Sequence, residues 1–230
     1  MIALRPAQTR GHADHGWLKS WHSFSFAEYF DPAEMGWGAL RVINEDVVAP
    51  GEGFPMHGHR DMEIVTVILA GALEHRDSLG NGAVLRPGEV QRMSAGLGVR
   101  HSEFNPSPEV ATHLLQIWIR PARSGATPGY EQREISLAPG ATLLASPDGR
   151  DGSVAIGQDA TLQRVRLVAD EIFVPDLAPD RFGYAHLISG ALETGDFPLS
   201  TGDGLKAHDA PGLRLTVASA ADFLWFDLPA

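Results

Sequence analysis

The feature that most restricts the fold of this chain is an internal repeat. The run ILAGALE at 68–74 recurs as LISGALE at 187–193, an offset of 119 residues. Each copy is followed by a turn sequence and then by an aromatic-containing segment that ends in proline: RPGE (86–89) with QIWIRP (116–121), and STGDG (200–204) with LWFDLP (224–229). The shared order of three features indicates a duplication, which predicts two similar units of about 110 residues in tandem.

The apolar segments have the length and composition of strands. Typical examples are EIVTVILAG (63–71), HLLQIWIRP (113–121) and YAHLISGAL (184–192), with turn signals such as SPDGRDG (146–152) between segments. Windows with apolar residues at helical spacing are scarce. We therefore predict an all-β fold with few short helices, and a short helical turn near AEYFDPAEM (27–35).

Repeat and strand pattern together predict two tandem β-barrels. We place the N-terminal barrel at 1–125 and the C-terminal barrel at 126–230. The turn-rich stretch PARSGATPGYEQRE (121–134) is the best candidate for a linker between them.

Charge and cysteine content exclude several classes of function. Lys and Arg number 18 and Asp and Glu 29, which gives a formal charge of −11 and argues against direct nucleic-acid binding. The chain has no cysteine, so disulfides, thiolate metal sites and thiol nucleophiles are excluded. It shows neither a secretory leader nor an apolar run of membrane-spanning length, so we expect a cytoplasmic protein without a membrane partner. A protein partner is compatible with the acidic charge.

Two short patterns carry candidate metal ligands. His57 and His59 are two residues apart, as are His101 and Glu103. Residues two apart on a strand point to the same side, so two such pairs on facing strands converge inside a barrel. Three imidazoles and one carboxylate suit a divalent first-row metal and leave positions open for substrate.

The same residues resemble the two motifs of cupins. HxH-x3-E-x7-G corresponds to His57, His59, Glu63 and Gly71, and G-x2-H-x3-N corresponds to Gly98, His101 and Asn105. More narrowly, the chain resembles the pirin family of bicupins, in its bacterial quercetin 2,3-dioxygenase-like branch. The resemblance covers essentially the whole chain and is carried by four segments: 10–32, 41–66, 93–107 and 116–121.

The resemblance bears on the fourth ligand. Cupins in general use the glutamate of the first motif, here Glu63, whereas pirin-like proteins use the residue two after the second-motif histidine, here Glu103. By spacing alone both can face inward. We expect Glu103 to be the ligand, and Glu63 to support the site or to pair with a residue such as Arg60.

The resemblance also implies an activity. Membership of this branch would imply metal-dependent cleavage of a flavonol such as quercetin by dioxygen, with release of carbon monoxide. In that reaction we expect Glu103 to be the general base. Iron(II) is the expected metal, and Cu, Ni, Mn, Co or Zn would fit the same donors. The alternative is a non-enzymatic, metal-binding regulatory protein that acts through a protein partner. We expect a monomer or weak dimer.

The remaining histidines give weaker signals. At the offset of 119 residues, the HxH positions of the second half are Asp176 and Ala178, so we expect a C-terminal barrel without metal ligands. We expect the histidines at 12, 15 and 22 to pack and hydrogen bond rather than to form a second metal site. His113 begins a predicted strand and is open as a core or pocket residue, whereas His75 follows the GALE turn, so we expect it to be exposed.

Overall fold

The computed structural model describes residues 1–195 and 197–230 and consists almost entirely of strands. The strands of its first half are β1 (Ile2–Arg5), β2 (Gly11–Asp14), β3 (Leu18–His22), β4 (Leu40–Val48), β5 (Gly53–His59), β6 (Glu63–Ala70), β7 (Leu73–Asp77), β8 (Gly82–Leu85), β9 (Glu89–Ser94), β10 (Val99–Phe104), β11 (Thr112–Ile119) and β12 (Gly129–Glu134). Those of its second half are β13 (Gly140–Ser146), β14 (Val154–Ala155), β15 (Thr161–Leu167), β16 (Ile172–Phe173), β17 (Phe182–Ser189), β18 (Ala191–Thr194), β19 (Phe197–Ser200), β20 (Gly204–His208), β21 (Leu215–Val217) and β22 (Ala221–Leu228).

The helical content is limited to two short 3-10 segments in the described residues, Ala7–Thr9 and Arg150–Gly152. The helical turn predicted near 27–35 is wrong. Phe26 and Tyr29 exchange backbone hydrogen bonds and close a tight hairpin, with Ala27 at φ +48°. That geometry leaves the backbone no helical hydrogen-bond pattern.

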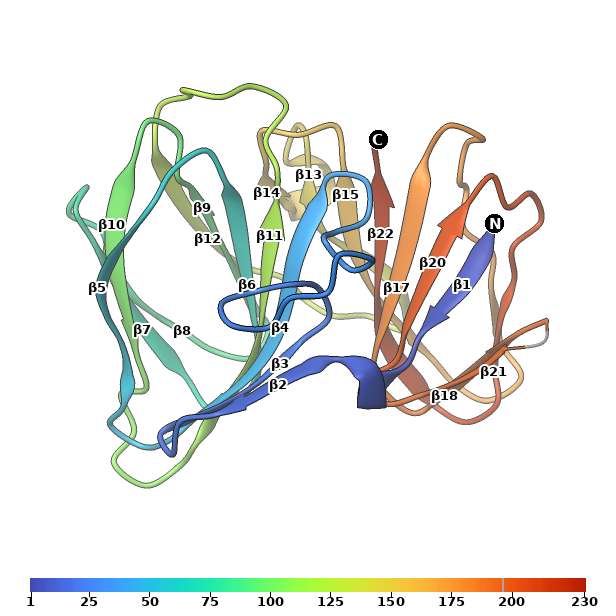
Figure 1. The fold of residues 1–230 in the computed structure, drawn as a ribbon, viewed down its shortest axis with the longest axis horizontal. Coiled ribbons are helices and arrows are strands. Elements are labelled where there is room, and N and C mark those ends of the chain that lie inside the picture. Colours follow the sequence, from blue (N-terminus) through green and yellow to red (C-terminus); the bar gives the residue numbers. More distant parts are fainter. Residues whose placement is uncertain (196) are drawn as a thin grey trace.

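Each half of the chain builds one barrel from two sheets, which confirms the predicted all-β, two-barrel fold (Figure 1). In the described residues the first barrel has a seven-stranded sheet, ordered β12-β9-β6-β11-β4-β3-β2, and a four-stranded sheet, β5-β10-β7-β8. The second barrel pairs the seven-stranded sheet β1-β20-β17-β22-β15-β13-β14 with the four-stranded sheet β16-β21-β18-β19. Strand pairing is antiparallel apart from β13 with β14.

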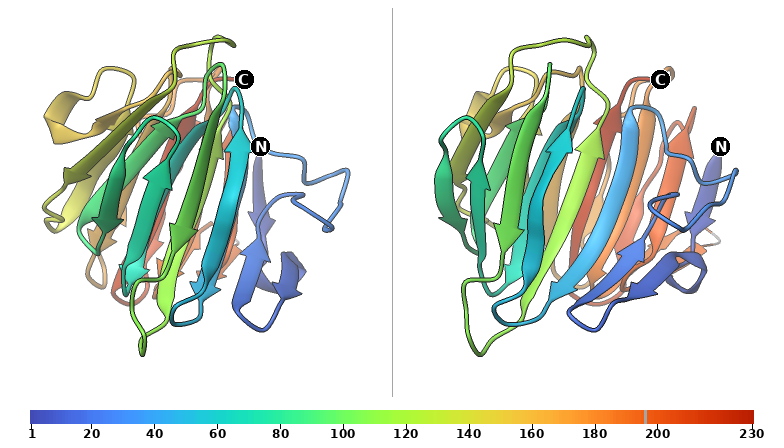
Figure 2. Two further views of the ribbon diagram at one scale, coloured as in Figure 1. Left: turned by 90° about the vertical axis from the view of Figure 1, so that its left-hand side faces the viewer. Right: turned by 60° about the vertical axis from the view of Figure 1, so that its left-hand side comes forward.

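The two barrels exchange their terminal strands. β1, at the N-terminus, pairs with β20 of the second barrel, and Figure 2 shows it apart from β2 and β3. β12 pairs with β9 of the first barrel, from Gly129 opposite Ser94 to Glu134 opposite Glu89. The second part of the predicted linker is therefore a strand, which covers an edge that β9 would otherwise expose. The division at 125/126 stays a prediction, and the hydrogen-bonded sheets cross it twice.

The sequence repeat corresponds to equivalent glycines in the two barrels. Gly71 lies between β6 and β7, and Gly190 lies between β17 and β18. Both have positive φ, +78° and +94°, and both approach the backbone where the last strand of their barrel begins, near Thr112 and Ala221. Only glycine combines this φ with so close an approach, which explains why the repeat is sharpest here.

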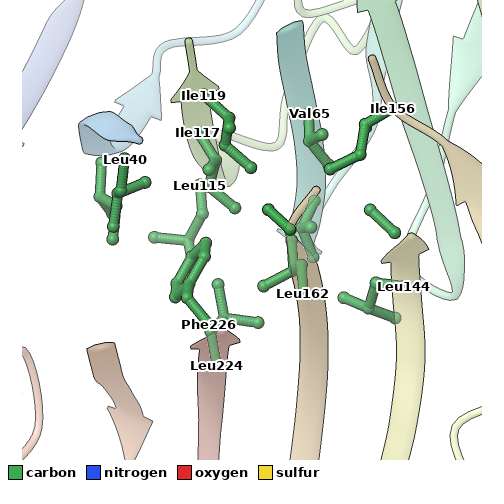
Figure 3. Close-up of a cluster of buried hydrophobic side chains, with 14 of the residues drawn as sticks. Leu40, Val65, Leu115, Ile117, Ile119, Leu144, Ile156, Leu162, Leu224 and Phe226 are labelled. Atoms are coloured by element: carbon green, nitrogen blue, oxygen red, sulfur yellow. The ribbon is translucent and has the colours of Figure 1, made fainter. Parts of the chain in front are cut away.

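The main hydrophobic core lies between the barrels, where the two seven-stranded sheets pack face to face (Figure 3). β11 shows how the chain supplies it. Leu115, Ile117 and Ile119 point into this core, together with Leu224 and Phe226 of β22. Because side chains alternate along a strand, the even-numbered residues of β11 face the interior of the first barrel.

We predict that Gly71→Ala lowers the free energy of unfolding by about 2–5 kcal/mol. A Cβ at Gly71 would lie 2.7 Å from the carbonyl oxygen of Ala111. The steric contact adds about 1–3 kcal/mol to the left-handed backbone cost of about 1–2 kcal/mol. The matched control is Gly80→Ala, which has φ +93° but no atom within 4 Å of the added Cβ. Equal losses in urea denaturation would contradict the close-approach argument.

Candidate metal centre

Three histidines converge between β5 and β10. His57 lies opposite His101 in the antiparallel register, and His59 lies opposite Val99. The ring of His57 is 4.5 Å from that of His101 and 4.8 Å from that of His59, and one ring nitrogen of each histidine lies within 4.8 Å of the others. Nε2 of His57 and Nε2 of His101 are 3.1 Å apart. Two nitrogens bound to one ion at about 2.1 Å and at right angles are about 3 Å apart, so this spacing fits a shared metal.

Burial favours the neutral form of two of these rings, His59 and His101. It lowers the pKa of His59 to about 4, with a further contribution from neighbouring His57. It lowers the pKa of His101 to about 2, with further contributions from the other histidines around it. At neutral pH these imidazoles therefore have a free lone pair, the form that binds metals. His101 is fully buried, whereas His57 and His59 are half-buried and leave one side of the cluster open.

Glu103 lies beside the histidines with one oxygen unpaired. A bulge after His101 shifts the register, and the carboxylate is 1% exposed. Gln116 donates a hydrogen bond from Nε2 to Oε2 at 2.9 Å, whereas Oε1 has no partner among the described residues and lies 4.0 Å from Nδ1 of His101. Burial raises the pKa of Glu103 to about 7, the bond from Gln116 lowers it, and the charge of Asp46 raises it. Because Oε1 is buried and has no hydrogen-bond partner, binding a cation or a proton would stabilise it.

The expected pairing of Glu63 with Arg60 is wrong. β5 ends at His59 and β6 begins at Glu63, with a turn between them, so the even spacing from His59 does not carry across. Glu63 instead shares the face of β6 that points to the second barrel, where it accepts hydrogen bonds from Ser94 Oγ at 2.7 Å and from the backbone of Gly157. It thus connects the barrels and lies outside both groupings of potential metal ligands.

A row of polar side chains crosses the sheet behind the site. We call it the polar row. Its members lie opposite one another on five adjacent strands and are Gln91, Thr66, Gln116, Asn44 and His22. It lies between two apolar clusters of the barrel interior, one with Ile64 and Val99 and one with Ile68 and Leu114. The interior of the first barrel is therefore layered, with its polar groups at the level of the histidines.

Aromatic rings border the cluster on one side. Trp118 packs edge-on against His59 at a centroid distance of 5.0 Å, and Phe26 packs edge-on against Trp118 at 5.3 Å. The indole N–H donates to Oε1 of Gln116 at 3.2 Å, which orients the amide that holds Glu103. We call Trp118 and Phe26 the aromatic wall.

Of the other histidines, His75 was misjudged. It was expected to be exposed, but its side chain is completely buried and belongs to a second potential ligand grouping with His101 and Glu103. The alternation along β7, where Leu73 and His75 are both buried, is the signal that would have placed it inside. Burial lowers its pKa, against the raising effect of Asp77.

Two of the three N-terminal histidines, His12 and His22, make contacts of the expected kind. His22 bonds Asn44 through Nδ1 at 2.8 Å and contacts Phe26, and His12 packs on Trp21. His113 lies at the contact between the barrels, with Nε2 3.0 Å from a carboxylate oxygen of Glu45. The potential metal groupings of the described residues do not include these side chains.

The second barrel has a different interior. Leucine, valine, alanine and aromatic side chains fill it, among them Leu187, Leu205, Phe223 and Trp225. His186, buried on β17, lies near Arg10 and Glu45, toward the first barrel. Burial, with a further contribution from the charge of Arg10, lowers its pKa to about 4. The potential metal groupings found in residues 1–195 and 197–230 lie in the first barrel.

Two tandem barrels with a histidine cluster in the first define a metal-binding bicupin. Sequence profiles agree: the family described as Pirin matches residues 3–119, and the one described as Quercetinase C-terminal cupin domain matches 143–228. The quercetin 2,3-dioxygenase of Escherichia coli (strain K12) is 49% identical over 229 residues, covering 100% of this chain and 99% of that protein. The chain belongs to the pirin family.

Solved structures support the same assignment. The crystal structure of the bacterial pirin YhhW from Escherichia coli in complex with nickel(II) matches with a TM-score of 0.96 at 49% identity, covering 100% of this chain and 99% of that one. A metal site in the present chain is thus supported by a relative and by its own donor set. None of the described helices is long and apolar enough to span a membrane.

We predict that stability declines as pH rises because of Asp46, which accepts a hydrogen bond from Ser20 next to the polar row. Burial raises its pKa from 3.8 to about 7, the Ser20 bond lowers it and the charge of Glu45 raises it. The folded state therefore binds more protons between these values, and stability falls across pH 4–7 by on the order of 1 kcal/mol per pH unit. Asp46→Asn should remove this contribution, so the difference in unfolding free energy between variant and wild type should grow over that window. Unfolding free energies from urea denaturation that changed in parallel with pH for variant and wild type would refute this prediction.

Proposed function

We propose that this protein is a metal-dependent dioxygenase that cleaves flavonols such as quercetin to a depside and carbon monoxide, consuming one dioxygen. The observation that carries the proposal is the placement of the unpaired Oε1 of Glu103 beside three clustered imidazoles. The names of the full-length relatives point to the same reaction.

His57, His59, His101 and Glu103 are the proposed ligands. The three histidines already form one grouping, and Glu103 is the carboxylate that shares a strand with His101. Three imidazoles and a carboxylate suit iron(II), our first expectation, as well as nickel(II) and other divalent first-row ions. When bound, such an ion would lower the pKa of a coordinated substrate hydroxyl and hold the substrate in place.

The proposal also assigns roles in proton transfer to Glu103 and to its neighbour Gln116. Oε1 of Glu103 is the proposed acceptor for the proton of the flavonol 3-hydroxyl, and the raised pKa of this carboxyl suits a group that takes up a proton near neutrality. Gln116 holds the other oxygen and so fixes the direction of Oε1. The buried position of the Glu103 side chain limits access of water to the proton transfer.

Substrate access is proposed on the half-buried side of His59. A hollow of about 380 Å³ borders it, with Arg60, Leu97 and Arg100 among its lining residues. The volume lies within the usual range for small-molecule sites, about 300–1,000 Å³. Two guanidinium groups there favour the approach of an electron-rich, partly ionised phenol, and the aromatic wall offers planar contacts to its rings.

The ligand assignment predicts that His57→Ala and His101→Ala each lose bound metal. Elemental analysis after reconstitution with iron(II) or nickel(II) should give about one ion per chain for wild type and little for the variants. His12→Ala, an exposed histidine outside the site, is the matched control. We expect modest changes in Tm, because the large cores between and within the barrels do not involve these side chains. Full metal content in either variant would exclude that residue as a ligand.

The dioxygenase assignment predicts saturable release of carbon monoxide from quercetin by the iron(II) protein. Glu103→Gln should reduce kcat by about 100-fold or more, since it removes the proton acceptor. Glu74→Gln on the neighbouring strand β7, an ion-pair partner of Arg76, should leave turnover unchanged. Metal content is measured in parallel, so that loss of the ion and loss of the base are separated.

Release no faster than the metal-only blank, tested with iron, nickel, copper and manganese, would overturn the proposal. A protein that retained its metal under those conditions would fit the regulatory alternative instead.

A further inference from the structure

His75 is a buried titratable residue that contacts His101 and has no role in the proposed chemistry. Its Nε2 lies 3.2 Å from Oδ2 of Asp77, and its Nδ1 lies 3.4 Å from Nδ1 of His101 and 3.5 Å from Nε2 of Gln91. The side chains of His75 and Asp77 are both completely buried. A buried histidine whose two ring nitrogens both have hydrogen-bonding partners favours one arrangement of its ring hydrogens.

The partners determine which nitrogen carries the hydrogen. Asp77 accepts from three donors in the turn between β7 and β8, the backbone N–H groups of Leu79 and Asn81 and the side-chain amide of Asn81. A carboxylate held in this way is an acceptor, so Nε2 of His75 donates to it. The amide nitrogen of Gln91 is solely a donor, so Nδ1 of His75 accepts.

The same logic then determines the tautomer of His101. Since Nδ1 of His75 accepts, Nδ1 of His101 is the donor in their contact. Oε1 of Glu103, at 4.0 Å, is too far to compete for that hydrogen. A neutral imidazole has one donor and one acceptor, so the lone pair of His101 is left on Nε2, the nitrogen 3.1 Å from Nε2 of His57.

We propose that Asp77 and His75 are positioning residues that act on the metal through His101. The chain runs from Asp77 Oδ2 to His75 to the Nδ1–H of His101, and it holds Nε2 of His101 toward the metal. The hydrogen bond to Asp77 makes His75 a stronger acceptor. A stronger acceptor for the Nδ1–H of His101 in turn makes His101 a stronger metal ligand. The proposal rests on the ligand set above, and it goes beyond it by assigning a tautomer and two further residues.

A residue from beyond the first barrel's sequence range completes the arrangement. Tyr130 of β12 stacks on His75 at a centroid distance of 4.8 Å and an interplanar angle of 28°. This contact fixes the plane of the His75 ring, and with it the direction of both hydrogen bonds. The strand that β12 adds to the first barrel therefore reaches the site through His75.

The first test uses the wild-type protein loaded with zinc, which is diamagnetic. Nitrogen-15 NMR of the histidine rings should show hydrogen on Nε2 of His75, and hydrogen on Nδ1 with metal on Nε2 for His101. The His101 Nδ1–H should exchange slowly because it is buried and bonded. Hydrogen on Nδ1 of His75, or a metal-bound His75, would overturn the proposal; the latter would make the His75, His101 and Glu103 grouping the metal site.

The second test is calorimetric titration of the apo-protein with nickel(II). His75→Phe keeps a ring to stack on Tyr130 but removes the acceptor, so we expect about 10–100-fold weaker binding. In His75→Asn the amide oxygen stands where ring Nδ1 was, so binding should recover at least half of that loss on a logarithmic scale. Asp77→Asn, which lacks the charge, should weaken binding by a smaller factor and serves if His75→Phe does not fold. His12→Phe is the control.

Affinities within twofold of wild type for both His75 variants would refute the positioning role. Because every readout is metal binding or a ring spectrum, the result is independent of flavonol cleavage. If His57→Ala also bound nickel as tightly as wild type, the ligand set itself would be at fault instead.

Discussion

The alternation of side chains along β11 is the constraint on which both the core and the site depend. Its odd-numbered residues, such as Leu115 and Ile117, enter the apolar core between the barrels. Its even-numbered residues, Gln116 and Trp118, face the interior of the first barrel and contact Glu103 and His59. Because a shift of one residue would exchange these two sets, the packing between the barrels also holds the register of the site.

The exchange of terminal strands extends this dependence to the whole chain. β1 completes the sheet of the second barrel, while β12 completes that of the first and stacks Tyr130 on His75. The loop that carries Phe26 is tied to the second barrel, since Lys206 Nζ lies 2.5 Å from a carboxylate oxygen of Glu34 and the indole N–H of Trp37 donates to the carbonyl of Gly183. The second barrel, with its apolar interior, thus supports one wall of the site.

Much of this could be predicted from local patterns. The repeat around Gly71 and Gly190 predicted two barrels because the same backbone conformation and close approach recur in both. The convergence of His57, His59 and His101 follows from strand periodicity once β5 and β10 are neighbours, as the register confirms.

The incorrect predictions concern residues whose positions depend on a turn or on a strand distant in sequence. Glu63 was placed by counting across a turn, which resets the inward and outward faces. The segment containing Gly129–Glu134 has a turn-rich composition, yet it is a strand because β9 offers it a hydrogen-bonding edge. His75 was taken for a surface residue because it follows the turn at 71–74, although its alternation with buried Leu73 indicates an inward side chain. Its contacts with His101 and Tyr130 join residues distant in sequence, so local patterns could not identify these partners.

The layering of the first barrel explains why its polar groups remain ordered. Burying side chains such as Asn44 and His75 costs free energy unless each donor meets an acceptor, and most of these groups do. Two exceptions at this level are Oε1 of Glu103 and Oγ1 of Thr66, which have no partner among the described residues. An apolar interior like that of the second barrel would be more stable on this account. Under the proposed ligand set, the unpaired oxygen of Glu103 carries a folding cost that a bound cation would offset, which would link metal affinity to fold stability.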